Sequence, residues 1–269
     1  MQLQNTKIAI IGGGNIGTAI TRGLLRSGKI PPENITLTRR NVSKISEFSS
    51  LGVIITDDNN HAVLTSDVII LAVLPSQFMG LIDSLKGVIK KDKNIIVSVV
   101  SAFNLQEMYQ RSGGGAIFVR AMPNIAAAVC ESMTCLCSNE EDMLSLEKVK
   151  LIFDELGSTL IIPETLMSSA TILGACGIAF FMRYIRAASQ GGIQVGFHAA
   201  EAQFIAAQTA RGATSLLLES GNHPEREIDK VTTPMGCTIA GLNEMEHNGL
   251  SSALIKGIVL SYNEINKLK

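Results

Sequence analysis

The first 162 residues alternate short aliphatic runs with amphipathic stretches. Runs rich in β-branched residues predict strands, and stretches with apolar residues at helical spacing predict helices. This alternation is typical of an α/β fold in which helices cover both faces of a parallel sheet. The predicted strands are Lys7–Ile11, Ile35–Thr38, Val68–Val73, Ile95–Val99 and Ile117–Arg120, with weaker ones at Met133–Cys137 and Thr159–Ile162, and the predicted helices include Asn15–Ser27, Val42–Ser50 and Asn104–Arg111.

After Pro163 the strand-like runs disappear and alanines recur at helical spacing. We therefore expect two domains with a boundary between residues 162 and 163, an α/β domain over 1–162 and an all-α domain over 163–269. Helices this rich in small residues bury little apolar area alone, which predicts that they pack against a second copy of the chain. The expected helices are Leu166–Gln190, His198–Ser220, Gly236–His247 and Leu250–Leu268.

Composition narrows the class of protein. Of 269 residues, 46% are apolar and 17% are charged, and the net charge of -1 leaves no basic face for nucleic acid. The five cysteines are an odd number with no C-x-x-C pair, which favours a reduced, cytoplasmic protein. No signal peptide is expected, because the run Lys7–Ile11 breaks into glycines. The longest apolar run, Ala170–Met182, predicts no membrane span because it ends at Arg183.

The sequence GGGNIG follows the first predicted strand and opens the first predicted helix. It matches G-x-G-x-x-G, with Gly12 for the tight turn, Gly14 for close approach to a pyrophosphate, and Gly17 for packing of helix on strand. Glycine-rich loops also close ordinary turns, but the strand–turn–helix context favours dinucleotide binding. Asn15 and Ile16 complete the predicted phosphate loop.

The end of the second strand indicates which dinucleotide binds. An NAD site normally places an acid here to hold the ribose 2′-OH. This chain instead has Thr38-Arg39-Arg40, and two guanidinium groups suit a 2′-phosphate. The alternative is a solvated basic pair on a loop. We therefore expect NADPH, with NADH possible.

Two proline-marked segments follow later strands, at Ala72-Val73-Leu74-Pro75 and Met122-Pro123-Asn124. Ligands of open parallel sheets bind beyond the carboxyl ends of the strands, which predicts that both segments contact the nicotinamide half. Either segment can equally be a loop entry. Asn59 completes the predicted cofactor contacts.

No metal site is expected. The histidines lack the spacing of zinc ligands, and Cys135 and Cys137 point to opposite faces if their segment is a strand.

A helix near the C-terminus has an unusual start. The segment TTPMGCTIAGL, residues 232–242, opens with a capping residue and a proline and then carries little side-chain bulk. The chain resembles the pyrroline-5-carboxylate reductase family in this segment, where the family has a sequence close to VTSPGGTTIAGL. The resemblance also includes GGGNIG, AVLP at 72–75, RAMPN at 120–124 and His223-Pro224, and so runs almost end to end.

This resemblance implies a Rossmann-type N-terminal domain and a helical C-terminal domain that interlocks with a partner's to form a homodimer, and dimers of this family often assemble further into higher oligomers. It implies NADPH-dependent reduction of 1-pyrroline-5-carboxylate to L-proline as the activity. It also implies that the helix start receives the substrate carboxylate on backbone amides. Carried over by position, the substrate-binding residues are Thr233, Met235, Gly236, Cys237 and Thr238, with Thr238 near the ring nitrogen as the catalytic residue.

Several positions depart from the family pattern. Met235 replaces a glycine, Cys237 a threonine, Leu74 a lysine and Ile178 a proline. These changes leave two alternatives open, a paralogue that reduces another cyclic imine and a non-catalytic NADP-binding dimer. The related β-hydroxyacid dehydrogenases are disfavoured, because no lysine lies between residues 150 and 230 for their catalytic position.

Overall fold

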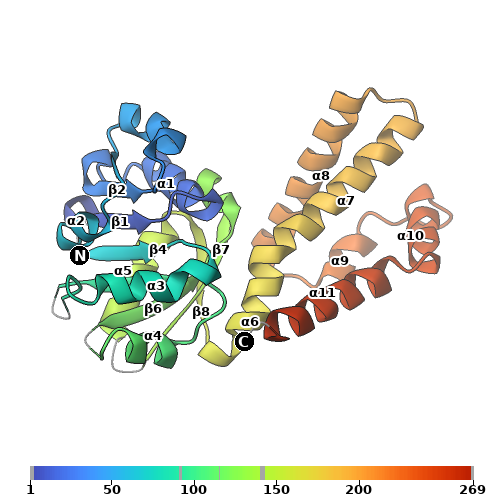
Figure 1. Ribbon diagram of the computed structural model, residues 1–269. Coiled ribbons are helices and arrows are strands. Elements are labelled where there is room, and N and C mark those ends of the chain that lie inside the picture. The colour runs from blue at the N-terminus through green and yellow to red at the C-terminus, as the bar shows by residue number, and fades with distance from the viewer. Residues whose placement is uncertain (1–2, 91–92, 115, 140–142, 268–269) are drawn as a thin grey trace. The chain divides into compact units, whose positions relative to one another are not determined.

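The computed structural model describes residues 3–90, 93–114, 116–139 and 143–267 and separates into two compact units. One unit contains the chain up to Cys176 together with the residues from Tyr262 onward, and the other is Gly177–Ser261. The predicted boundary at 162/163 stays a prediction. Figure 1 labels the helices and strands of both units.

The first unit is built on an eight-stranded sheet with the order β3-β2-β1-β4-β5-β6-β7-β8. All neighbouring strands are parallel except β6 and β7, which are antiparallel. The chain leaves β1 toward β2 on one side and returns to β4 on the other, so the strand order reverses between β1 and β4. Ligands of such sheets bind at this reversal. The strands are β1 Ile8–Ile11, β2 Ile35–Thr38, β3 Ile54–Thr56, β4 Val68–Leu71, β5 Ile95–Ser98, β6 Ile117–Met122, β7 Ser132–Ser138 and β8 Gly157–Ile161.

Alternate residues of β1 face two separate hydrophobic cores. Ile8 and Ile10 pack with helices α1 (Asn15–Ser27) and α5 (Met143–Asp154) and with the 3-10 helix η3 (Val42–Leu51). Ala9 and Ile11 pack against the other three helices, on the opposite face of the sheet (Figure 1). Because both faces are covered, the central strands read as continuous apolar runs. The helices on the second face are α2 Asn59–Leu64, α3 Pro75–Leu85 and α4 Leu105–Arg111.

The predicted α/β class and most predicted elements are confirmed. Two details differ from the expectation: β7 runs antiparallel to β6, and the stretch predicted as a helix at Val42–Ser50 is a 3-10 helix. The remaining short elements of this unit are the 3-10 helices η1 Leu3–Asn5, η2 Pro32–Asn34, η4 Ile125–Val129 and η6 Glu164–Leu166, the helix α6 Met167–Ala170 and the π-helical turn η7 Thr171–Cys176.

The second unit is helical, as expected. It bears few buried side chains: α8 buries Ala202 and α7 buries Gly177 and Ser189. This unit therefore lacks a hydrophobic core of its own among the described residues. Its helices are α7 Gly177–Gln194, α8 Ala199–Ser220, α9 Pro224–Asp229, α10 Cys237–His247 and α11 Leu250–Lys267, the last of which extends into the first unit.

One helical stretch, Glu164–Gln194, is long and apolar enough to cross a membrane by length and composition alone. It has 31 residues and includes an 18-residue window of mean hydropathy 1.7. The run Ala170–Met182 lies within this stretch, which continues past Arg183 with few charges, and the expectation of no membrane span stays a prediction. A core helix of a globular protein meets the same criteria.

Candidate active site

The glycine-rich loop joins β1 to α1 at the reversal of strand order. Gly12 has a φ of +113°, and the amides of Gly12 and Gly13 both donate to the carbonyl of Thr38, at 3.2 and 2.7 Å. Gly14 occupies the N-cap position of α1 and no side chain caps it. The first amides of α1 have no partner within the helix, and the helix dipole favours an anion there. The loop therefore has the geometry that can hold a phosphate.

Each glycine of the motif is needed for a different reason. A Cβ on Gly12 would lie 2.5 Å from the carbonyl oxygen of Ala72, and one on Gly17 would lie 2.0 Å from that of Gly12. A Cβ on Gly14 would meet nothing within 4 Å. Gly12 and Gly17 are thus required by the fold itself, whereas Gly14 leaves space open at the surface of the loop.

That space belongs to a cavity of about 1110 Å³ along the carboxyl ends of β1, β2 and β4. The cavity brings together most of the predicted cofactor residues, and other residues that the sequence pattern does not indicate also line it. The predicted residues that line it are Gly12, Gly14, Asn15, Ile16, Thr38, Arg39, Arg40, Asn59, Ala72, Val73 and Leu74, and the additional ones include Gly13, Asn41, Lys44, Gln77, Leu81 and Ile125.

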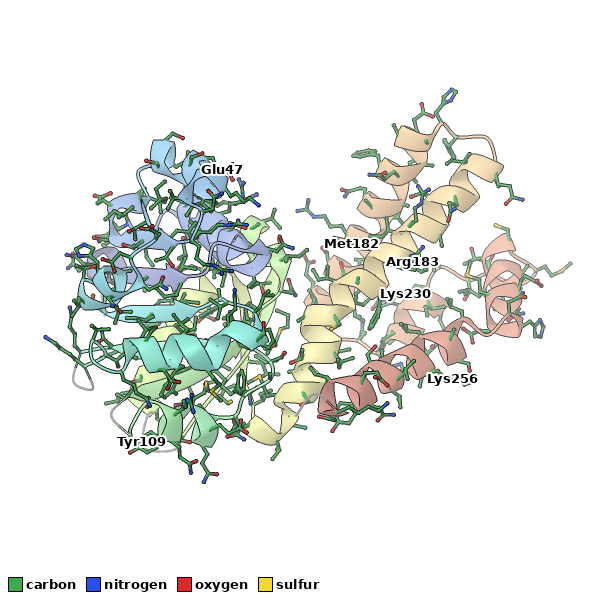
Figure 2. The ribbon with its side chains drawn as sticks, viewed as in Figure 1. Glu47, Tyr109, Met182, Arg183, Lys230 and Lys256 are labelled. Carbon is green, nitrogen blue, oxygen red and sulfur yellow. The ribbon has the colours of Figure 1, made fainter. Side chains whose placement is uncertain are left out.

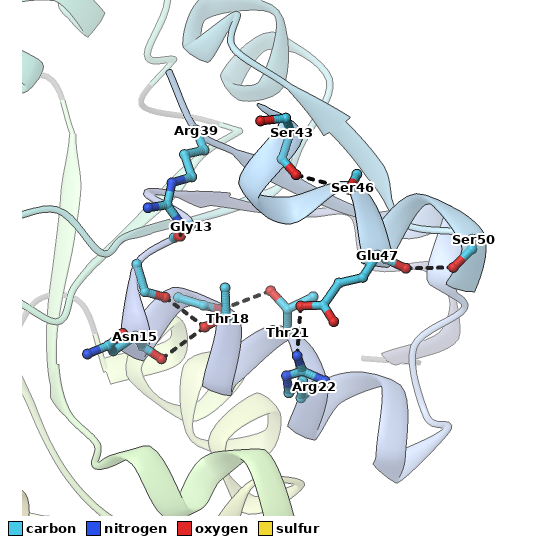
Figure 3. Close-up of polar contacts among 12 residues, drawn as sticks. Gly13, Asn15, Thr18, Thr21, Arg22, Arg39, Ser43, Ser46, Glu47 and Ser50 are labelled. Atoms are coloured by element: carbon cyan, nitrogen blue, oxygen red, sulfur yellow. Dashed lines mark hydrogen bonds and ion pairs between the residues drawn. The ribbon is translucent and has the colours of Figure 1, made fainter. Parts of the chain in front are cut away.

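Several polar contacts hold the β2 side of this cavity. The hydroxyl of Thr38 donates to Oδ1 of Asn59 at 2.7 Å, which fixes the start of α2 next to β2. Arg39 donates from Nη1 to the carbonyl of Gly13 at 2.6 Å (Figure 3). The glycine loop is therefore tied to the β2 end by side-chain as well as backbone bonds.

The other predicted cofactor residues lie apart from the cavity lining. Gly17 is buried in α1, and Pro75 is the first residue of α3. Met122 and Asn124 are also buried, and Asn124 donates from Nδ2 to the carbonyl of Gly174 at 3.0 Å. Asn124 also accepts from the amide of Ala126 and so caps η4. Met122, Pro123 and Asn124 thus place their neighbour Ile125 at the cavity, and their own contact with a cofactor stays a prediction.

In the second unit, the predicted substrate residues form a tight turn that opens α10. The amide of Gly236 donates to the carbonyl of Thr233 at 2.9 Å, and Met235 has a φ of +59°. A positive φ at the third residue of a turn is the type II geometry, which favours glycine. The family glycine at this position therefore suits the turn better than the fully exposed Met235 does.

Gly236 is the N-cap of α10, and no side chain caps it. A Cβ at Gly236 would lie 2.5 Å from Oγ1 of Thr233, so only glycine leaves room for that hydroxyl beside the helix start. Cys237 and Thr238 are the first two residues of the helix and are exposed. Their amides have no partner within the helix, so an anion can bind there. The low side-chain bulk of this segment therefore leaves the first amides of α10 accessible to an anion.

Cys135, Cys137 and Cys176 fit a structural role. None forms a disulfide, and burial raises the pKa of the Cys137 thiol to about 12 and also raises the pKa of Cys135 and Cys176. Such thiols are poor nucleophiles because they stay protonated. Among the described residues, no group of three metal-ligating side chains comes together.

Comparison with known proteins agrees with this arrangement. Residues 7–102 match the family described as NADP oxidoreductase coenzyme F420-dependent, and residues 164–268 match pyrroline-5-carboxylate reductase dimerisation. Pyrroline-5-carboxylate reductases 1 and 2 of Dictyostelium discoideum are 46% and 44% identical to this chain over 97% and 98% of its length. The chain spans 49% of the first relative and 93% of the second.

A solved structure shares the whole fold. The pyrroline-5-carboxylate reductase of Coxiella burnetii superposes with a TM-score of 0.88 at 27% identity, covering 98% of both chains. A dinucleotide-type sheet domain joined to a helical dimerisation domain defines an NAD(P)-dependent oxidoreductase. Within that class, this chain belongs to the pyrroline-5-carboxylate reductase family, and the predicted resemblance is confirmed.

Proposed function

We propose that this protein reduces 1-pyrroline-5-carboxylate to L-proline with NADPH. The observation that carries the proposal is the uncapped start of α10, where Thr233 and Thr238 flank free helix amides in a chain of this family. This helix start offers what a cyclic imino acid needs, an anion site for its carboxylate and a hydroxyl for its ring nitrogen.

The substrate carboxylate would bind the first amides of α10. Gly236 keeps side-chain bulk away from these amides, and the hydroxyl of Thr233 adds a donor at the same end. Thr238 would hydrogen-bond near the ring nitrogen, as its position in the family motif implies. The protein then mainly positions the imine and removes it from water, because a protonated imine needs no protein nucleophile.

The cofactor would lie in the cavity of the first unit, with its pyrophosphate at Gly14 and Asn15 and its adenosine end near Arg39 and Arg40. When bound, NADPH supplies the hydride that reduces the imine carbon. Leu74 lines the same cavity at the position of the family lysine, and its apolar side chain is compatible with a nicotinamide neighbour.

A direct assay tests the proposal. Purified protein should oxidise NADPH when pyrroline-5-carboxylate is supplied, and should do so faster than it oxidises NADH. A panel of other cyclic imines serves as the comparison. Turnover of another imine alone would indicate a paralogue, and NADPH binding without turnover of any imine would indicate a non-catalytic dimer.

The proposal also includes the oligomeric state and the cellular compartment. We propose that the protein works as a homodimer in the reducing cytoplasm, because its dimerisation domain covers 164–268 and its five cysteines are free.

A further inference from the structure

The three cations at the β2 side of the cavity are not equivalent. Arg39 is half-buried and already bonded, whereas Arg40 and Lys44 are exposed. All three line the cavity. Neither Arg40 nor Lys44 forms an ion pair within the part of the chain that the structure describes.

The side chain of Arg39 is bonded to the glycine-rich loop. Its Nη1 donates to the carbonyl of Gly13 at 2.6 Å, and its backbone amide donates to the carbonyl of Thr56 at 3.0 Å (Figure 3). A guanidinium held in this way fixes the shape of the glycine loop. That shape serves the adenosine and pyrophosphate, which NADH and NADPH share.

Lys44 is held at the cavity by its neighbours in η3. Ile45 is fully buried, and its Cγ2 would lie 2.8 Å from a Cβ on Gly13, so η3 packs directly against the glycine loop. Oδ1 of Asn41 accepts from the amide of Ser43 at 3.1 Å and caps the first turn of η3. Lys44 therefore starts from a fixed backbone position, and its ammonium group forms no ion pair with the residues that the structure describes.

The surrounding acids do not neutralise this pair of cations. Glu47, in the next turn of η3, pairs with Arg22 at 2.7 Å. Asp58 accepts from the amide of His61 and caps α2, and neither Asp57 nor Asp58 lines the cavity. The β2 end thus presents uncompensated positive charge to whatever the cavity holds.

We propose that Arg40 and Lys44 together bind the 2′-phosphate of NADPH, and that Arg39 shapes the loop for either cofactor. This assignment rests on the proposed use of a nicotinamide dinucleotide and moves the cofactor selectivity from the Arg39-Arg40 pair to Arg40 and Lys44. A phosphate dianion between these two cations gains a charge-assisted bond from each.

The experiment measures binding of two fragments that lack nicotinamide, 2′,5′-ADP and ADP, to the intact chain by calorimetry at low salt. Wild-type protein should bind 2′,5′-ADP more tightly. Arg40→Ala and Lys44→Met should each weaken 2′,5′-ADP by about tenfold or more and leave ADP nearly unchanged, since each removes one bond to a charged group. Arg39→Ala should weaken both fragments in parallel.

Lys29→Met is the matched control, because Lys29 is exposed and lies outside the cavity lining; it should change neither affinity. The assignment would be overturned if Lys44→Met kept the full preference for 2′,5′-ADP, if Arg39→Ala alone abolished that preference, or if wild-type protein bound both fragments equally. Fragment binding requires no turnover. Loss of imine reduction with intact selectivity would therefore refute the proposed function and leave this assignment in place.

Discussion

At the scale of single residues, the glycines of the GGGNIG motif have different roles. Gly17 lies against the carbonyl of Gly12, and any side chain there would have to push the loop away from the helix. Gly14 has an extended backbone, with φ of -86°, that other residues adopt freely. Its lack of a side chain is therefore useful to a ligand but is not required for folding.

Substitutions separate the role of Gly17 in folding from the role of Gly14 in ligand binding. Gly14→Ala should leave the free energy of unfolding nearly unchanged and weaken NADPH binding, because the new methyl group projects toward the pyrophosphate position. Gly17→Ala should destabilise the protein by about 1–3 kcal/mol, as overpacking does. Urea unfolding and NADPH fluorescence titration provide the two measurements. Equal loss of binding and stability in Gly14→Ala would contradict the assignment.

Thr238 is the residue on which the proposed chemistry depends. Thr238→Ala should lower the rate of imine reduction by about tenfold or more, the value of one hydrogen bond to a charged group, while the Kd for NADPH stays the same. Thr238→Ser keeps the hydroxyl and serves as the control, with most of the rate retained. A parallel loss of NADPH affinity would instead place Thr238 at the cofactor.

At the scale of elements, one ion pair between a buried arginine and a partly exposed glutamate joins three segments of the first unit. Glu164 in η6 accepts through Oε1 from Nη1 of Arg120 at 2.9 Å and from the amide of Leu105 at 2.7 Å. Arg120 lies on β6 with its side chain 3% exposed, and its Nη2 donates to the carbonyl of Ser101. Glu164 thereby connects β6, the start of α4 and the segment that leads to the helical part of the chain.

Removing this carboxylate should be costly. Glu164→Ala leaves the Arg120 charge buried without its counterion, which typically costs about 3 kcal/mol or more. The exposed pair of Arg22 and Glu47 provides the control, and Glu47→Ala should cost about 1 kcal/mol or less (Figure 3). Urea midpoints at one protein concentration compare the two. Similar shifts in both variants would contradict a special role for Glu164.

Strong patterns made most of these elements predictable, and weak patterns did not. The aliphatic run before GGGNIG predicts β1, and the glycines of that motif predict the turn into α1. Both are local signals in the sequence. Strand β3 has three residues, too few to show a pattern, and it forms because β2 offers it an edge. Lys44 was not predicted because its place at the cavity depends on Ile45 packing against Gly13, a contact between distant parts of the chain.

At the scale of the whole molecule, the helical unit exposes apolar side chains that a core would normally bury. Phe181 and Met182 on α7 and Phe204 on α8 are all more than half exposed, and Met182 is followed directly by the charged Arg183 (Figure 2). Exposed apolar area on this scale is typical of an interface between subunits. The match of residues 164–268 to a dimerisation family assigns that role to the same segment.

A charge introduced into this surface tests the assignment. Phe204→Glu should weaken the dimer by at least about 2 kcal/mol, because an aromatic anchor is lost and a carboxylate would be desolvated in its place. Leu144→Glu is the matched control: Leu144 on α5 is 84% exposed, compared with 71% for Phe204, but lies outside the dimerisation segment. Light scattering over a dilution series measures the mass of each variant. We expect Phe204→Glu to dissociate at concentrations where wild-type protein and Leu144→Glu stay dimeric, and the reverse order would mean that the subunits associate through the sheet domain instead.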